Sequence, residues 1–193
     1  MLGKRPVLSM LAEVNTASER SHNLILIGFM GTGKTTVGKR VARSLGFRFV
    51  DTDALIVKKA GKSIPKIFED DGETEFRALE TKVLRECAGK TGQVISTGGG
   101  IVTIDENRPL LKEAGYVIWL KAEAEVIYER VRRNRERPLL HTANPEETIK
   151  KLLDSRVSLY KECADFTIAT DNLTMEETCF GVTECARLAL EPT

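Results

Sequence analysis

The chain has 193 residues, of which 41% are hydrophobic and 30% are charged, and its formal net charge is +1. This length suits one well-buried core, and the composition is typical of a soluble globular protein. The near-neutral charge gives no electrostatic reason to expect a nucleic acid or an anionic membrane as a partner. We find no apolar run near the ~20 residues that cross a bilayer, and we recognise no secretory leader. We therefore expect a cytoplasmic protein.

The four cysteines form no C-x-x-C pair, so we expect reduced thiols and no zinc site. Residues 1–22 show no sustained hydrophobic period and precede the first apolar run. We interpret them as a flexible N-terminal extension without chemistry, followed by one domain over residues 23–193. A transit peptide is the alternative for this segment, but Glu13 and Glu19 argue against it.

The first predicted strand, residues 24–27, runs into a glycine-rich turn and then into an amphipathic helix that Gly46 ends. The turn, residues 28–35, has the complete spacing G-x-x-x-x-G-K-[ST] of a phosphate-binding P-loop. Its backbone N–H groups and the positive end of the helix dipole would cradle phosphate oxygens. Lys34 can reach the β- and γ-phosphates, and the hydroxyl of Thr35 can hold Mg²⁺. The sequence therefore predicts that the chain binds a nucleoside triphosphate.

Two acids follow the second predicted strand, residues 47–50. Because ligands bind outside the carboxyl ends of parallel strands, Asp51 and Asp53 are well placed for chemistry. One of them could instead simply cap the next helix, which Gly61 ends. A cap does not need both aspartates, so we expect a functional role for at least one.

A long helix is predicted from residue 73 to the glycine at residue 89. It carries Arg77 and Glu80 one turn apart, which by themselves indicate a surface ion pair. The third predicted strand, residues 93–97, runs into three successive glycines at 98–100. Such a triplet costs conformational entropy, and it makes sense where a backbone passes very close to a ligand. A plain flexible turn is the alternative interpretation.

The rest of the chain continues the alternation of strands and helices. Strands are predicted over residues 116–120 and 166–169, and helices over about 108–114, from 124, from the Asn144 cap and from the Thr174 cap. The basic run from Arg130 to Arg137 usually means a solvated face, but it also suits a mobile lid, which we expect near residues 132–145. The predicted fold class is α/β: a three-layer α/β/α P-loop kinase fold with a five-stranded parallel sheet.

Over residues 24–190 the sequence resembles the shikimate kinases. The resemblance rests on six motifs in this order and spacing: GFMGTGKTTVG at 28–38, DTD at 51–53, Phe76-Arg77, STGGG at 96–100, RPLL at 137–140 and RVSLY at 156–160. It implies transfer of the γ-phosphoryl group of ATP to the 3-hydroxyl of shikimate, with one Mg²⁺ per site, in chorismate and aromatic amino acid synthesis.

The resemblance also implies a role for each matching residue. The residues implied for ATP binding are Gly31, Thr32, Gly33, Lys34, Thr35, Thr36, Arg130 and Arg137. In shikimate binding they are Asp53, Arg77, Gly98, Gly99, Gly100 and Arg156. Thr35 would hold Mg²⁺ directly and Asp51 through water. The implied catalytic residues are Lys34, Asp53, which orients or deprotonates the attacking hydroxyl, and the lid residue Arg137.

The chain departs from the family at one position of the last motif. The family usually has a proline two residues after the second carboxylate-binding arginine, where it would stiffen the turn at the helix end, and Ser158 stands there instead. The glycine triplet and the paired arginines favour shikimate, a small acid with ring hydroxyls, as the substrate.

Three alternative functions compete with this interpretation. A kinase of another small hydroxy acid, such as gluconate, would share the phosphate-binding residues. A nucleotide-binding regulator on the same scaffold would be expected to lose Lys34 or Asp53, and both are present. A nucleic-acid binder is suggested only by the basic run near the lid, which lacks interleaved aromatic residues. We expect a monomer with shikimate and ATP as its partners, and neither a nucleic acid nor a membrane.

Overall fold

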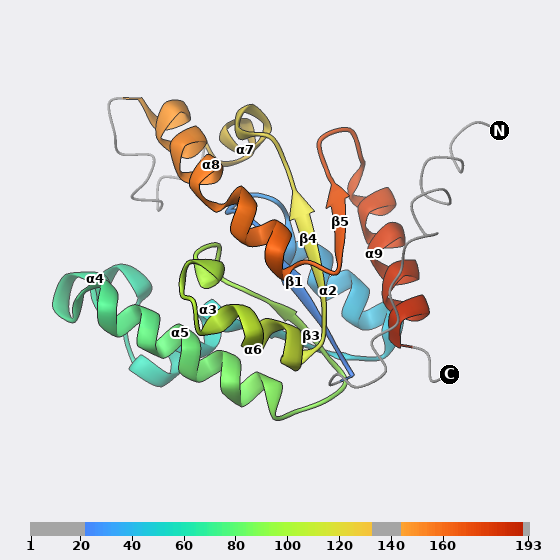
Figure 1. Cartoon of the computed structure of the whole chain (residues 1–193), viewed down its shortest axis with the longest axis horizontal. Helices are drawn as coiled ribbons and strands as arrows, with labels where there is room; N and C mark the ends of the chain where they lie inside the picture. The colour runs from blue at the N-terminus through green and yellow to red at the C-terminus, as the bar shows by residue number, and fades with distance from the viewer. Residues whose placement is uncertain (1–21, 133–143, 191–193) are drawn as a thin grey trace.

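The computed structural model describes residues 22–132 and 144–190. Figure 1 shows a central sheet with helices on both sides. Almost all of the predicted N-terminal extension and most of the predicted lid, including Arg137 and the RPLL motif, lie outside the described residues.

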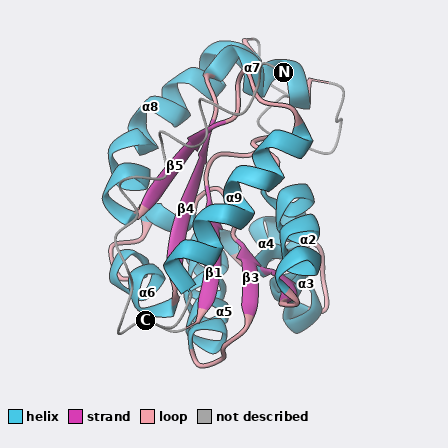
Figure 2. Cartoon of the chain, turned by 90° about the vertical axis from the view of Figure 1, so that its right-hand side faces the viewer, coloured by secondary structure: helices cyan, strands magenta, loops and turns pink. Residues whose placement is uncertain are grey.

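The sheet has five parallel strands, as the sequence predicts. Their order is β2-β3-β1-β4-β5, so β1 lies in the centre with β3 and β4 as its neighbours. Figure 2 shows the strands running alongside one another between the flanking helices. The strands are β1 (Asn23–Ile27), β2 (Arg48–Asp51), β3 (Gln93–Ser96), β4 (Tyr116–Lys121) and β5 (Phe166–Ala169).

The helices fall between or after the strands, which gives the right alternation for parallel pairing. They are α2 (Lys34–Leu45), α3 (Thr52–Ala60), α4 (Ile64–Asp70), α5 (Gly72–Ala88), α6 (Asn107–Ala114), α7 (Ala124–Val131), α8 (Pro145–Cys163) and α9 (Met175–Leu190). A short 3₁₀ turn, η2 (Ile101–Thr103), follows the glycine triplet. Each predicted helix in the described ranges is confirmed, with its ends shifted by a residue or two.

Two hydrophobic cores lie on opposite faces of the sheet. Strand β1 contributes Ile25 and Ile27 to one core, and Leu24 and Leu26 to the other, because side chains alternate along a strand. The first core is shared with helices α3 to α8, and the second with α2 and α9. A central strand buried on both faces is therefore apolar at every position after its first residue, which is the run seen in the sequence.

Local signals set the helix ends where the sequence places them. Gly46 and Gly61 end α2 and α3 in the left-handed conformation, with φ of 69° at each. Asn144 caps α8 by accepting from the Glu147 N–H, and Thr174 exchanges hydrogen bonds with Glu177 in a complete capping box. In the described part of the chain, every helix is too short or too polar to cross a membrane.

Candidate active site

The P-loop lies at the carboxyl end of the central strand β1 and leads into α2. Gly31 and Gly33 have φ of 76° and 94°, a left-handed backbone that residues with a Cβ rarely adopt. These two glycines turn the chain so tightly that the N-terminus of α2 opens into the loop. The free N–H groups of that first helical turn are the expected phosphate donors.

Lys34 lies inside this loop. Its ammonium donates to the carbonyl oxygens of Gly28 and Phe29, at 2.7 and 2.8 Å, and the residue is only 8% exposed. Thr32 also donates to the Phe29 carbonyl, at 2.9 Å. The loop thus holds a positive charge at the place where a triphosphate would lie.

Oxygen ligands for a cation gather beside the loop, where β1, β2 and β3 end. The hydroxyl of Thr35 donates to the carboxylate of Asp51 at 2.9 Å, and the hydroxyl of Ser96 lies 3.4 Å from that of Thr35. Mg²⁺ prefers one or two carboxylate or hydroxyl oxygens together with phosphate oxygens and water. The residues present therefore fit a magnesium ion that is held jointly with a nucleotide.

Asp51 has a second task in the same place. Its other carboxylate oxygen accepts from the N–H groups of Asp53 and Ala54, so it is the N-cap of α3. The sequence offered capping and chemistry as alternatives for the aspartates. The geometry assigns the cap to Asp51, whereas the carboxylate of Asp53 lies against Gly98.

A cavity of about 310 Å³ joins these groups. Its lining includes P-loop residues, Asp51, Asp53, Gly99 and Arg130. Arg130 comes from α7, and its guanidinium donates to the hydroxyl and the carbonyl of Thr170, at 3.0 and 2.8 Å. Arg130 is thereby fixed at the far side of the P-loop, just beyond the end of β5.

The glycine triplet after β3 is required by close contact and not by backbone conformation. None of Gly98, Gly99 and Gly100 has a positive φ. A Cβ on Gly98 would lie 2.7 Å from a Glu80 oxygen and 2.8 Å from an Asp53 oxygen, and one on Gly100 would overlap the Arg77 guanidinium. The carboxylate of Asp53 and the guanidinium of Arg77 therefore lie directly against this turn.

Hydrogen bonds hold the turn from three sides, so the interpretation as a plain flexible turn is wrong. The Gly98 N–H donates to Thr52 at 3.1 Å, the Gly99 carbonyl accepts from the Tyr160 hydroxyl at 2.5 Å, and the Gly100 carbonyl accepts from Thr103 at 2.7 Å. Tyr160 is fully buried and stacks on Trp119, and burial raises the pKa of its phenol. Tyr160 stays a neutral donor.

Arg77 and Glu80 do not form the surface ion pair that the sequence suggests. Glu80 is 1% exposed, and its carboxylate accepts from Arg77 Nη1 at 2.5 Å. Burial raises the pKa of the Glu80 carboxyl although the Arg77 charge acts in the opposite direction. On the solvent side, Glu73 accepts from Nε and Nη2 of the same guanidinium, at 3.2 and 2.9 Å.

Arg156 reaches the glycine turn from α8. Its guanidinium lies over the Phe29 ring, 5.5 Å from the centroid, and Nη1 donates to the Gly99 carbonyl at 3.4 Å. Ser158 lies well inside α8 and is exposed, so the expectation that this position is a turn at the helix end is wrong. Arg156 and Tyr160 are one helical turn apart and both contact Gly99.

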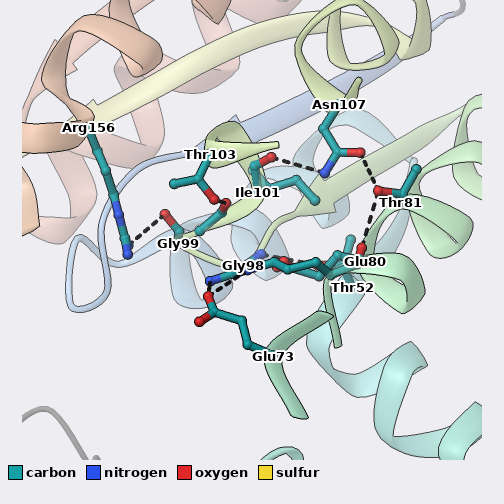
Figure 3. Close-up of polar contacts among 12 residues, drawn as sticks. Thr52, Glu73, Glu80, Thr81, Gly98, Gly99, Ile101, Thr103, Asn107 and Arg156 are labelled. Carbon is teal, nitrogen blue, oxygen red and sulfur yellow. Dashed lines mark hydrogen bonds and ion pairs between the residues drawn. The ribbon is translucent and has the colours of Figure 1, made fainter. Parts of the chain in front are cut away.

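The described residues thus form two adjoining groups at one edge of the sheet. The first contains the P-loop with Lys34, Thr35 and Asp51, and the second surrounds residues 98–100. Of the residues implied for the substrate, Asp53, Arg77 and Arg156 come together in this second group. Figure 3 shows Arg156 directed toward Gly99. Sequence reasoning missed Thr52, Glu80 and Tyr160 as members of the group.

Comparison with known proteins gives a consistent result. A family model described as shikimate kinase matches residues 30–187. The shikimate kinase of Thermodesulfovibrio yellowstonii is 51% identical over 155 residues, which cover 80% of this chain and 89% of that protein. That of Geobacter sulfurreducens is 49% identical over 169 residues, covering 88% and 91%. The solved structure of a shikimate kinase from Acinetobacter baumannii in complex with shikimate has a TM-score of 0.81 at 41% identity, covering 90% and 96%.

Proposed function

Because this chain belongs to the shikimate kinase family, we propose that it transfers the γ-phosphoryl group of ATP to the 3-hydroxyl of shikimate. The products are 3-phosphoshikimate and ADP, in the route to chorismate and the aromatic amino acids. One observation supports the proposal above the others: a carboxylate and two guanidinium groups converge on the glycine turn beside the P-loop.

We assign binding of the nucleotide to the P-loop and α7. The backbone of Gly31, Thr32 and Gly33 and the first turn of α2, with Thr35 and Thr36, bind the phosphates, and Arg130 contacts the base. Lys34 exchanges its present carbonyl partners for phosphate oxygens, which are stronger acceptors because they are charged. Thr35 would hold Mg²⁺ directly and Asp51 through water, and the bound ion would neutralise charge on the transferring phosphoryl group.

We assign binding of shikimate, the phosphoryl acceptor, to the group around residues 98–100. Shikimate is a small anion with a planar carboxylate, and guanidinium forks recognise that group geometrically. Arg77 and Arg156 hold the carboxylate, and the backbone of the three glycines lies against the ring. This orientation presents the 3-hydroxyl to Asp53.

Asp53 accepts the proton of the 3-hydroxyl as that oxygen forms its bond to the γ-phosphorus. The bond from the γ-phosphorus to the bridging oxygen breaks at the same time and leaves ADP. Lys34 stabilises the negative charge that develops on the phosphoryl oxygens. We assign a similar role to Arg137 of the predicted lid, which lies outside the described residues and would also exclude water.

We expect this protein to act as a cytoplasmic monomer. The gluconate alternative is disfavoured because relatives of 41–51% identity are shikimate kinases. The regulator alternative is disfavoured because Lys34 and Asp53 are retained in fitting positions.

An acceptor panel tests the proposed function directly. With ATP and Mg²⁺, ADP release should be far faster with shikimate than with gluconate or quinate, and Lys34→Ala should abolish turnover. Faster turnover with gluconate would overturn the proposal.

The carboxylate assignment has its own matched pair of variants on α5. Arg77→Ala should raise the shikimate KM by about 10–100-fold, as expected for loss of a charged two-point contact, and leave the ATP KM unchanged. Arg85→Ala removes the same charge from an exposed position of the same helix, paired with Glu106, and should change neither constant. An unchanged shikimate KM in Arg77→Ala would show that this arginine does not bind the carboxylate.

A further inference from the structure

Asn107, the first residue of α6, is fully buried, and both ends of its side-chain amide are bonded outside its own helix. Its Oδ1 accepts from the Thr81 hydroxyl of α5 at 2.8 Å. Its Nδ2 donates to the carbonyl of Ile101 in η2 at 3.1 Å. Burying an amide is costly unless both ends are paired, and these pairs do not help to form α6. The amide instead joins α5 to the turn that follows the glycine triplet (Figure 3).

The orientation of the amide follows from its neighbours. A carbonyl such as that of Ile101 can only accept, so Nδ2 must face it. Oδ1 then faces Thr81, whose hydroxyl must donate. The same hydroxyl lies 3.2 Å from the Arg77 carbonyl, so its other neighbour is the backbone of the arginine itself.

Each end of this link adjoins the group of residues around the glycine turn that we assign to shikimate. Thr81 is one helical turn beyond Arg77 and contacts its backbone. Ile101 directly follows Gly100, whose Cα faces the Arg77 guanidinium so closely that a Cβ could not fit between them. The chain of contacts therefore runs from the Arg77 backbone through Thr81 and Asn107 to the turn, and back to the head of the same arginine.

The ion pairs of Arg77 cannot replace this link. Glu73 and Glu80 both belong to α5, so they orient the guanidinium relative to its own helix. They do not set the distance between α5 and the glycine turn. The Thr81–Asn107–Ile101 contacts cross between these two segments, and they do so in the interior, where water competes least.

We propose that Thr81 and Asn107 are positioning residues that keep the Arg77 guanidinium in register with the backbone of residues 98–100. They act through Arg77 and the turn and do not touch the substrate. The inference rests on the proposed function, because it concerns the site assigned to the shikimate carboxylate. Loss of the link should loosen carboxylate binding and leave nucleotide binding intact.

Thr81→Val tests the link, because valine keeps the shape of threonine and lacks the hydroxyl. We expect a rise in the shikimate KM on the order of tenfold, since displacements of about 1 Å at a site have effects of this size or larger. The ATP KM should stay within twofold of the wild type. Thr81→Ser keeps the hydroxyl and should restore the wild-type shikimate KM.

Thr183→Val is the matched control. Thr183 is also a buried threonine in a helix, and its hydroxyl donates to the Cys179 carbonyl four residues earlier, in α9. This variant should change the melting temperature without changing either KM. A shikimate KM in Thr81→Val that matches Thr183→Val would overturn the proposal, and so would an equal rise in both KM values.

A double-mutant cycle approaches the link from its other end and does not depend on one variant alone. Asn107→Ala should raise the same shikimate KM, and the double variant Thr81→Val/Asn107→Ala should be no worse than the more affected single one. Additive effects would show that the two residues act separately and would overturn the proposal. Absence of shikimate turnover in the wild type would contradict the proposed function itself, and the link with it.

Discussion

Arg77 lies between two carboxylates of its own helix, one on its buried side and one on its solvent side. Glu80 holds Nη1 from the buried side, whereas Glu73 covers Nε and Nη2 from the solvent side. The Nε–Nη2 edge is one that a planar carboxylate occupies in a side-on pair. Glu73 therefore stands where the proposed substrate carboxylate would bind, and it must move away first.

Glu73→Gln should lower the shikimate KM by about twofold, because an exposed i,i+4 ion pair is worth only about 0.3–0.5 kcal/mol. Steady-state kinetics at low ionic strength measure the effect. Glu75→Gln, in the same exposed first turn of α5, makes the same change of charge and should have a smaller effect. A higher KM in Glu73→Gln would mean that Glu73 holds the arginine ready for the substrate.

Two glycines separate the effects of contact and of conformation. Gly98→Ala should reduce kcat strongly and leave the ATP KM unchanged, because its Cβ would displace the carboxylates of Asp53 and Glu80. Gly46→Ala meets open space but has φ of 69°, so it should cost about 1 kcal/mol of stability and no activity. Thermal unfolding and turnover, measured on both variants, should give opposite patterns. Full activity of Gly98→Ala would contradict the close approach of Asp53 to the turn.

Helix α3 is capped by Asp51, a residue that has two roles. Asp51 caps this helix with one oxygen and contacts Thr35 with the other. Asparagine caps helices as well as aspartate does, but it carries no charge for a cation.

Asp51→Asn should therefore lower turnover at limiting Mg²⁺ with little change in melting temperature. Asp51→Ala should lower both, with a loss of about 1 kcal/mol for the missing cap. Calorimetry and a magnesium titration of the rate measure the two effects. Equal melting temperatures for the two variants would argue against the capping role.

The elements themselves follow from local patterns, and so could be predicted. The P-loop spacing, the glycines that end α2 and α3, and the Asn144 and Thr174 caps all act within one helical turn of their own position. Asp51 and Asp53 could be placed at the site because parallel strands end at a common edge.

The missed residues depend on contacts between distant segments. Tyr160 reaches Gly99 across 61 residues, and Asn107 reaches Thr81 across 26. No local period encodes such pairs. Glu80 is different, because it lies on the same helical stripe as Phe76, Val83 and Leu84, so its burial could have been recognised from the sequence.

Across the whole molecule, three of the cysteines lie in the two cores. Burial raises the pKa of the Cys163 thiol to about 11 and that of Cys185 to about 12, and it also raises the pKa of Cys87. Because these values exceed the ordinary 9.0, the unfolded chain loses thiol protons first as the pH rises. Their contribution to stability is full below about pH 9 and declines as the pH approaches 11–12.

Alkylation at pH 8 should follow the same pattern. Only the thiolate reacts, so Cys185 should be modified at least 100-fold more slowly in the folded protein than in guanidinium chloride. Cys179, which is only partly buried, should react first. Mass spectrometry of the labelled peptides measures both rates. Rapid labelling of Cys185 in the native protein would contradict the packing of α9 against the sheet.

The strand order assigns the two reactants to different parts of the chain. The centre strand leads into the nucleotide loop, while the segments after β2 and β3, together with α8, supply the side chains next to the glycine turn. Changing the recipient of the phosphate would thus require new residues in α3, α5, α8 and the 98–103 segment. The P-loop and α7, which we assign to the nucleotide, could stay unchanged. This scaffold is therefore suited to directed evolution toward other small acids.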